Sequence, residues 1–349
     1  MRLPLSRIFG VVAILVATLA LAACGGLLPK NSSLRSQQSL HQTAINKLKE
    51  MGSSPGAPMM IRIFKQTNEF EVWKQTNSGQ FKLFNTYQIC AYSGTFGPKI
   101  KEGDRQAPEG FYNITPALMN PNSNYYLAFN TGFPNKFDRS WGRTGANLMV
   151  HGDCSSSGCY SMTDEGVAEI YALARETFAA GNTIIQMQSF PFRMTPKNLA
   201  QMKDNPNLPF WMDIKEGYDR FELTHKPPNW DVCDKKYVFD LTTDGKPLDA
   251  TAACPAREGD TLEASLQAKE QADDAQFKVE VAAIDARDAK QTAAEQQAEA
   301  EKQALKGRGQ AVGGFFSGVF GGGSAGANAP GQSGDAAPAP VPMPAPKGA

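Results

Sequence analysis

Residues 150–164 read VHGDCSSSGCYSMTD, and this stretch decides how the chain around it is interpreted. It places His151, one of three histidines, eight residues before Cys159. An acyl-transfer enzyme with a thiol nucleophile needs a cysteine, a histidine that takes its proton, and backbone N–H groups directed at the developing oxyanion. The pattern therefore indicates Cys159 as a nucleophile and His151 as its proton acceptor and donor.

Small residues between these two side chains predict a sharp turn. Ser157 and Gly158, with Gly152, give the backbone the freedom to present its amides around Cys159. Residues 147–150, of which the last three are apolar, predict a strand that ends at the histidine, and Thr163 predicts the N-cap of a helix that stops near residue 181. We expect the dipole of this helix to lower the pKa of the thiol.

The motif His-Gly-x-Cys-x-Ser-x-Gly-Cys-Tyr-x-Met-Thr-Asp over residues 151–164 resembles the YafK-like branch of the YkuD-type L,D-transpeptidases. Three upstream segments are also similar to that branch: GDRQAPEGFY (103–112), NPNS (120–123) and FNTGFPN (129–135). Recognisable blocks cover residues 59–193. This sequence departs from the wider family in two ways: its His–Cys gap is shorter than in most members, and Ser161 stands where many carry arginine.

The resemblance implies a YkuD-like β-sandwich and a reaction on peptidoglycan. In that family the cysteine attacks a peptide bond centred on diaminopimelate in a stem peptide, and a thioester acyl-enzyme forms. An amine acceptor then gives a transpeptidase of cell-wall synthesis or remodelling. Water instead gives a hydrolase that cleaves the link between a wall-attached lipoprotein and peptidoglycan. The implied partners are stem peptides and such a lipoprotein, and the sequence leaves the acceptor open.

The cysteines leave other interpretations open. One interpretation is a zinc site formed by metal-ligating residue types: His151, Asp153, Cys154 and Cys159. Structural zinc sites usually show paired ligands at short spacing, and the chain has no CxxC pair. We therefore predict no metal and no cofactor. A disulfide between Cys154 and Cys159 would instead indicate a non-catalytic wall-binding scaffold. In a third interpretation, Cys154 is a resolving thiol, the redox partner that switches the enzyme off on oxidation.

The remaining composition bounds the partners and crosslinks. The 349 residues include 35 basic and 35 acidic side chains, which argues against a nucleic-acid partner. Cys233 and Cys254 form a candidate disulfide, which leaves Cys90 as a small buried apolar residue. Arg143 is a candidate for binding a substrate carboxylate, because its guanidinium offers a planar fork of donors.

The N-terminus predicts a lipoprotein. Residues 1–23 have a basic start and an apolar run at 11–20, too short for a membrane span of about 20 residues. The following LAAC at 21–24 resembles a bacterial lipobox, with Cys24 as the lipidated residue. Gly25, rather than aspartate, favours the outer membrane of a Gram-negative bacterium by resemblance to its lipoproteins. We expect an enzyme anchored by lipid at the periplasmic face of the envelope.

The composition divides the rest of the chain into four segments. Residues 24–58 are polar and predict a tether. Residues 59–258 predict a catalytic domain that is mainly β with α, with meandering antiparallel strands near 61–63, 69–72, 81–90, 125–129 and 184–190. Residues 260–306, rich in Ala, Glu, Lys and Gln, predict a long solvated helix, and the Gly/Pro/Ala-rich residues 307–349 predict a disordered tail.

Overall fold

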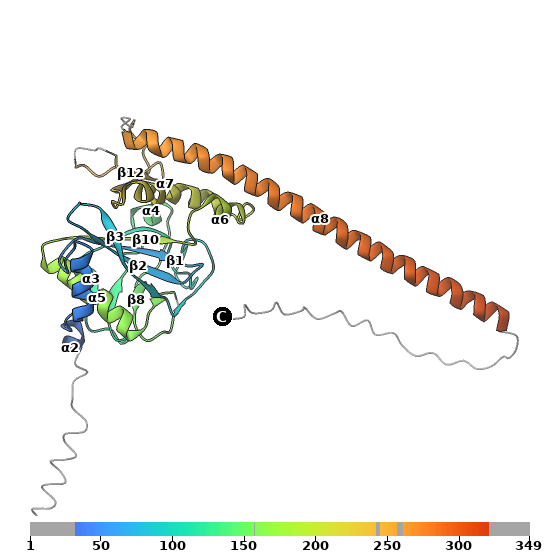
Figure 1. Cartoon of the computed structure of the whole chain (residues 1–349), viewed down its shortest axis with the longest axis horizontal. Coiled ribbons are helices and arrows are strands. Elements are labelled where there is room, and N and C mark those ends of the chain that lie inside the picture. Colours follow the sequence, from blue (N-terminus) through green and yellow to red (C-terminus); the bar gives the residue numbers. More distant parts are fainter. Residues whose placement is uncertain (1–31, 157, 242–244, 257–260, 321–349) are drawn as a thin grey trace, which may run out of the picture. The chain divides into compact units, whose positions relative to one another are not determined.

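The computed structural model describes residues 32–320 except 157, 242–244 and 257–260 (Figure 1). The chain divides into two units, residues 1–285 and 286–349, and each is described by itself. The predicted signal segment and Cys24 lie outside the described residues. In the part of the chain that the structure covers, no helix is both long enough and apolar enough to cross a membrane.

Two five-stranded sheets form the frame of the first unit. The first sheet has the strand order β3-β2-β1-β10-β5. Its strands are β1 (Met59–Phe64), β2 (Glu69–Gln75), β3 (Phe81–Gln88), β5 (Gly110–Ile114) and β10 (Ile185–Phe190). All of β1 is buried, since Ile61 and Ile63 face one apolar cluster while Phe64 faces another. A sheet covered on both faces explains why every residue of this strand is buried, including Arg62.

The second sheet carries the motif stretch, and its strand order is β4-β9-β8-β7-β6. Its short strands are β4 (Ala91–Tyr92), β6 (Met119–Asn120), β7 (Ala128–Asn130), β8 (Met149–His151) and β9 (Tyr160–Ser161). The prediction of a purely antiparallel meander is wrong at two places, because β1 pairs with β10 and β8 pairs with β9 in parallel. Two parallel strands need a connection that returns the chain to the end of the sheet at which the first strand began. The alternation of apolar and polar residues within a strand does not reveal such a connection.

Helix α5 (Asp164–Ala179) packs into the core shared by both sheets. The hydroxyl of Thr163 accepts the Gly166 N–H, as the predicted N-cap requires. Val167, Ile170 and Leu173 are fully buried, and the helix lies against β1, β7 and β8. The predicted helix behind the motif is therefore confirmed.

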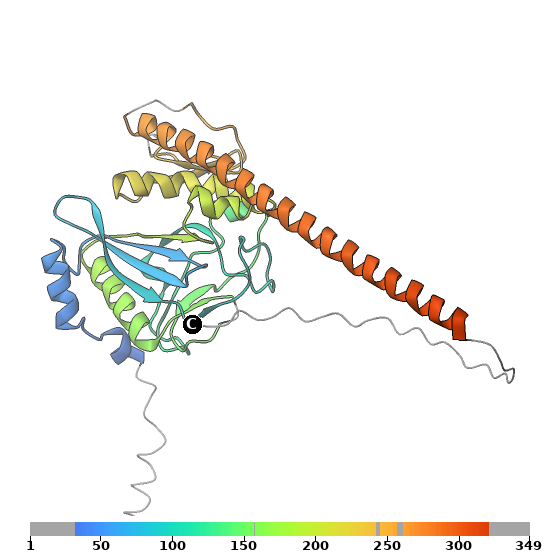
Figure 2. The same cartoon turned by 45° about the vertical axis from the view of Figure 1, so that its right-hand side comes forward.

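The described part of the predicted tether is docked on the domain. It contains α2 (Ser32–Ser36) and α3 (Gln42–Glu50), which lie beside α5 in Figures 1 and 2. Ala44 and Leu48 are buried in the same core as the sheets. Lys74 Nζ donates to the carbonyls of Pro55 and Ala57. The sequence interpretation missed this because two buried apolar residues in a polar stretch give only a weak helical pattern.

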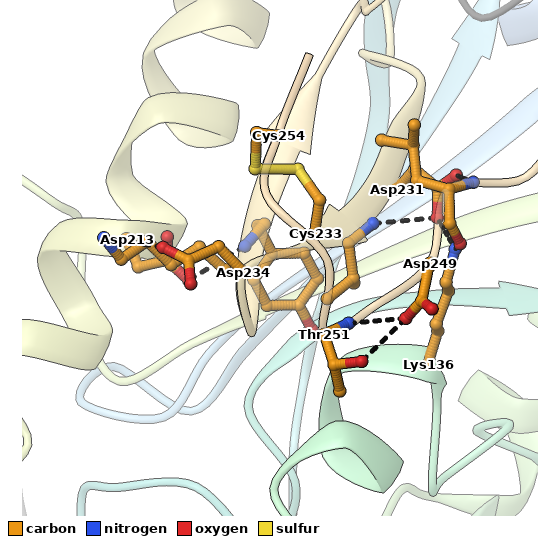
Figure 3. The surroundings of a disulfide bond; sticks show 12 residues. Lys136, Asp213, Asp231, Cys233, Asp234, Asp249, Thr251 and Cys254 are labelled. Atoms are coloured by element: carbon orange, nitrogen blue, oxygen red, sulfur yellow. Dashed lines mark hydrogen bonds and ion pairs between the residues drawn. A yellow bond between two sulfur atoms is a disulfide. The ribbon is translucent and has the colours of Figure 1, made fainter.

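A second layer covers the other face of the first sheet. It comprises α4 (Lys136–Ser140), α6 (Pro196–Ala200), α7 (Leu208–Thr224), and the hairpin of β11 (Trp230–Cys233) and β12 (Lys236–Phe239). A short 3₁₀ helix, η1 (Pro116–Leu118), precedes β6. Cys233 forms a disulfide with Cys254, which ties the hairpin to the segment after it (Figure 3). The N–H groups of Asp234 and Lys235 donate to carbonyls of that segment, at 2.7 Å each.

Helix α8 (Thr261–Phe320) begins where the sequence predicts a solvated helix but continues past residue 306. The prediction of disorder from residue 307 is therefore wrong for 307–320, while 321–349 lie outside the described residues. Glycines disfavour a helix by about 1 kcal/mol each without forbidding it, and no proline occurs between residues 261 and 329. In the first unit, Leu266 is buried and Arg220 of α7 forms an ion pair with Glu263 of α8.

Candidate active site

The parallel pairing of β8 with β9 brings the two motif side chains together. Val150 lies opposite Tyr160, and both are fully buried in the core. Side chains alternate along a strand, so Met149 and His151 point to the opposite face. Extending the register by one residue places Cys159 beside Met149 on that same face. A separation of eight residues in the sequence thus becomes a neighbouring position on one face of the sheet.

A cavity of about 440 Å³ lies on that face, and both His151 and Cys159 line it. Tyr125 stands at its wall, with its ring centroid 4.8 Å from that of His151. Apart from the histidine, the described residues around this cavity are uncharged, and amides and hydroxyls dominate its polar lining: Asn120, Ser123, Asn124, Asn147, Ser155 and Ser156. The described lining of the cavity therefore offers neutral hydrogen-bonding groups beside apolar surface.

His151 is buried, with 4% of its surface exposed. Its Nδ1 lies 2.6 Å from the carbonyl oxygen of Gly152. Because a carbonyl can only accept, this contact selects the tautomer in which Nδ1 donates and Nε2 accepts. A backbone carbonyl thus orients the ring, in the role that a carboxylate has in a Ser-His-Asp triad.

Cys159 is the one free cysteine among the described residues, and it is half-buried. The Met149 N–H donates to its sulfur at 3.3 Å. Burial raises the pKa of the Cys159 thiol, while the Met149 N–H opposes this shift. The expectation that a helix dipole lowers this pKa is wrong, because β9 follows Cys159 and α5 begins only at Asp164.

The glycines of the turn have different roles. The Gly152 N–H donates to the carbonyls of Tyr125 and Leu127, at 3.1 and 3.2 Å, so it is not available to an oxyanion. A Cβ at Gly152 would lie 2.5 Å from Asp164 Oδ1. Glycine at this position therefore allows the backbone to lie close to the Asp164 carboxylate. Gly158 has a φ of +127°, and its N–H makes only a long 3.4 Å contact with a serine hydroxyl. Ser157 lies outside the described residues.

Cys154 forms a disulfide with Cys90, not with Cys159. Two interpretations are corrected by this pairing: a Cys154–Cys159 bridge and a resolving role for Cys154 toward the nucleophile. The expectation of a lone, buried Cys90 is wrong as well. The reason is the sheet, since β4 pairs with β9 and the Cys90 N–H donates to Ser161 O at 2.9 Å. The bridge also removes Cys154 from any zinc site, and the described residues hold no group of three or more metal-ligating side chains.

Arg143 does not face the cavity. Its guanidinium lies 2.8 Å from a carboxylate oxygen of Asp138, and both side chains are buried. It also stacks over Phe137 and Phe210, at 4.9 and 5.1 Å from the ring centroids. The proposed binding of a substrate carboxylate by Arg143 is therefore replaced by a structural ion pair. A residue in a loop gives no sequence signal of such a partner.

Of the three upstream segments that resemble the family, only NPNS (120–123) lines the cavity. The other two lie outside its lining. Asp104 accepts the N–H groups of Ile100, Lys101 and Gln106 and closes a loop. Glu109 pairs with Lys65 at 2.9 Å, and neither side chain is exposed. Asn120 and Ser123 of NPNS line the cavity. The sequence resemblance included this segment, but it did not indicate that the segment forms a wall of the cavity.

Comparison with known proteins identifies close relatives. The chain is 42% identical over 183 residues to YafK of Escherichia coli K12, provisionally named as an L,D-transpeptidase, and equally to its counterpart in E. coli O157:H7. This match covers 52% of the chain and 74% of each relative. No family model matches the chain.

Two solved structures show weaker likeness. The helical cell shape determining protein Pgp2 of Campylobacter jejuni is 20% identical with a TM-score of 0.31, over 44% of this chain and 55% of that one. Bd1075 of Bdellovibrio bacteriovorus is 20% identical with a TM-score of 0.27, over 39% and 49%. The identity of 42% and the coverage of 74% of each YafK relative decide the family. The chain belongs to the YkuD-type L,D-transpeptidases, in their YafK-like branch.

Proposed function

We propose that this protein is an acyl-transfer enzyme of the bacterial cell wall, with Cys159 as nucleophile and His151 as general base. The observation that supports this best is the shared cavity, in which a buried, oriented histidine and the one free thiol of the described residues line the same surface. Membership of an L,D-transpeptidase family supports peptidoglycan stem peptides as the proposed substrate class.

The first half-reaction forms a thioester. Nε2 of His151 takes the thiol proton, and the sulfur attacks the carbonyl carbon of a diaminopimelate residue. Backbone N–H groups at Gly158 and Cys159 stabilise the resulting oxyanion. The intermediate collapses with cleavage of the peptide bond, and the leaving amine takes the proton from His151. Because burial raises the pKa of Cys159, the resting thiol is protonated and depends on His151 at the moment of attack.

The second half-reaction releases the acyl group. An amine attacks the thioester carbonyl, His151 takes its proton, and Cys159 leaves and is reprotonated. This sequence forms a new amide and makes the protein a transpeptidase. Attack by water through the same steps gives a free carboxylate and makes it a hydrolase, for example of a bond between a lipoprotein and the wall.

Intact-mass and product analysis distinguishes these outcomes. The full chain would be incubated with tripeptide and tetrapeptide muropeptides and with a lipoprotein-linked fragment, beside Cys159→Ala and His151→Ala. We expect an acyl adduct that depends on Cys159 and resolves onto an amine. Release of the same acyl group to water would assign the hydrolase instead. Absence of both adduct and turnover under reducing conditions, with the Cys90–Cys154 disulfide intact, would support a non-catalytic scaffold.

The envelope location is part of the same proposal. Lipidation of Cys24 would hold the enzyme at the periplasmic face of a Gram-negative outer membrane, where its substrate lies. Mass spectrometry of the mature N-terminus tests this, because diacylglyceryl on Cys24 must be lost in Cys24→Ser. A wild-type chain that begins at another residue, without lipid, would contradict it.

A further inference from the structure

Among the described residues that line the cavity at Cys159, none is a lysine or an arginine that could pair with an anionic substrate. Its described polar walls are amides and hydroxyls, and Arg143, the cation indicated by the sequence, is paired with Asp138. If the proposed function holds, the substrate is a stem peptide, which carries free carboxylates close to the bond that is cleaved. A carboxylate that leaves water needs a cationic partner to bind well.

The loop of residues 99–106 brings a cation to the nucleophile's turn. A Cβ built on Gly158 would lie 4.0 Å from the Cα and the carbonyl carbon of Arg105. Gly158 directly precedes Cys159, so the backbone of Arg105 packs against the turn that carries the nucleophile. Both positions are held in unusual conformations, with φ of +54° at Arg105 and +127° at Gly158. Glycine adopts such a φ readily, whereas at Arg105 it is a strained conformation of the kind that accumulates at functional sites.

The loop is held firmly on both sides of Arg105. Asp104 Oδ1 accepts the Gln106 N–H at 3.0 Å, and its Oδ2 accepts the Ile100 N–H at 2.9 Å. The carbonyl of Ile100 accepts the Thr144 N–H at 3.1 Å, which ties the loop to the segment that leads into β8. The anchoring polar groups belong to the neighbours of Arg105, so its own side chain is not needed to hold the loop.

The side chain of Arg105 is exposed and has no partner within the described residues. Its neighbours in the loop contrast with it, since Lys99 forms an ion pair with Asp104. The backbone of Arg105 is held beside the turn that carries Cys159, and its guanidinium has no carboxylate partner among the described residues. Such a guanidinium is able to bind a carboxylate of a ligand with two parallel N–H donors.

We propose that Arg105 binds a carboxylate of the stem peptide beside Cys159 and thereby selects substrates whose acidic group lies next to the cleaved bond. This inference rests on the proposed function. Arg105 takes no part in the chemical step. Its loss therefore raises KM and removes discrimination between acidic and amidated substrates, while kcat changes little.

The experiment compares stem peptides in which each carboxylate in turn is replaced by a carboxamide. With the wild-type chain we expect one amidation to raise KM about tenfold or more, as for the loss of a charge-assisted hydrogen bond. Arg105→Gln should raise KM for the acidic peptide by a similar factor and turn over acid and amide alike. Arg105→Lys should restore part of the discrimination.

Lys101→Gln is the matched control, because it removes an exposed cation from the same loop. It should leave KM and the discrimination near wild-type values. The inference is overturned if Arg105→Gln still distinguishes the acidic peptide from the amidated one as the wild type does. It is also overturned if Lys101→Gln has an equal effect, because the positive charge of the loop as a whole, rather than Arg105 itself, would then attract the substrate. If the wild-type chain turns over no stem peptide at all, the proposed function itself is wrong. That result differs from failure of this inference, in which the wild type is active but Arg105 has no effect on substrate choice.

Discussion

Cys90 and Cys154 form a disulfide that ties the residue before β4 to the turn directly after His151. The Cys154 N–H also donates to Met162 O at 3.3 Å, and the Met162 N–H donates to His151 O at 2.7 Å. The turn between the histidine and the cysteine is thus fastened at its base by one covalent bond and two hydrogen bonds. The segment that presents Cys159 is held while the thiol itself remains free.

The first prediction concerns this disulfide. The double variant Cys90→Ala/Cys154→Ala should lose about 4 kcal/mol of unfolding free energy, since the bond spans 64 residues in sequence. Transfer activity should fall as well, because the turn is released. Denaturant unfolding and the rate of acyl-adduct formation measure the two effects. The double variant is used because a single one leaves a thiol that can pair with Cys159. Unchanged adduct formation in a folded double variant would show that the disulfide does not position the turn.

The second prediction concerns the protonation of Cys159. Burial raises the pKa of this thiol, so its alkylation by iodoacetamide should increase with pH through a midpoint above about 8.5, the ordinary value of a cysteine. The rate is followed by intact mass, with Cys159→Ala as the control that lacks the label on this thiol. A midpoint near 6 would contradict this prediction and would indicate a resting thiolate–imidazolium pair.

The third prediction concerns Gly152. An alanine Cβ would meet Asp164 Oδ1 at 2.5 Å and Tyr125 O at 3.1 Å, so Gly152→Ala should cost about 1–3 kcal/mol of stability. The same shift moves the carbonyl that orients His151, so kcat should fall more than KM rises. Gly307→Ala is the control, because a Cβ there meets nothing within 4 Å. Full activity in Gly152→Ala would show that the carbonyl does not set the histidine.

The fourth prediction concerns Asp213, which lies near the Cys233–Cys254 disulfide (Figure 3). Burial raises its pKa to about 7, against the opposing hydrogen bond from the Tyr237 N–H. The unfolded chain ionises this group near pH 4, so the folded state loses stability between that pH and about 7. Asp213→Asn keeps an acceptor for Tyr237 and should be stabilising by about 2–3 kcal/mol more at pH 8 than at pH 5. Unfolding at both pH values checks this, and a pH-independent difference would exclude it.

The sequence predicted those parts of the fold that depend on neighbours in the chain. Helix α5 followed from Thr163 and the spacing of Val167 and Ile170. Strand β1 followed from the alternation of Ile61 and Ile63 with Arg62, and β10 from the strand-like segment 184–190. The docking of α3 could not be predicted from the sequence. Its two buried residues are isolated apolar side chains in a polar segment, and only the tertiary structure shows the core against which they pack.

By itself, the sequence selected His151 and Cys159, because a thiol nucleophile and its base require particular residue types and the motif places them a few residues apart. Only the tertiary structure decided that Cys154 pairs with Cys90, that Arg143 pairs with Asp138, and that Gly152 is a position of close approach. These outcomes depend on which strands pair and on what lies within a few ångströms of a side chain. The parallel pairing of β8 with β9 sets the site, and it arises from packing across the whole sheet rather than from any local pattern.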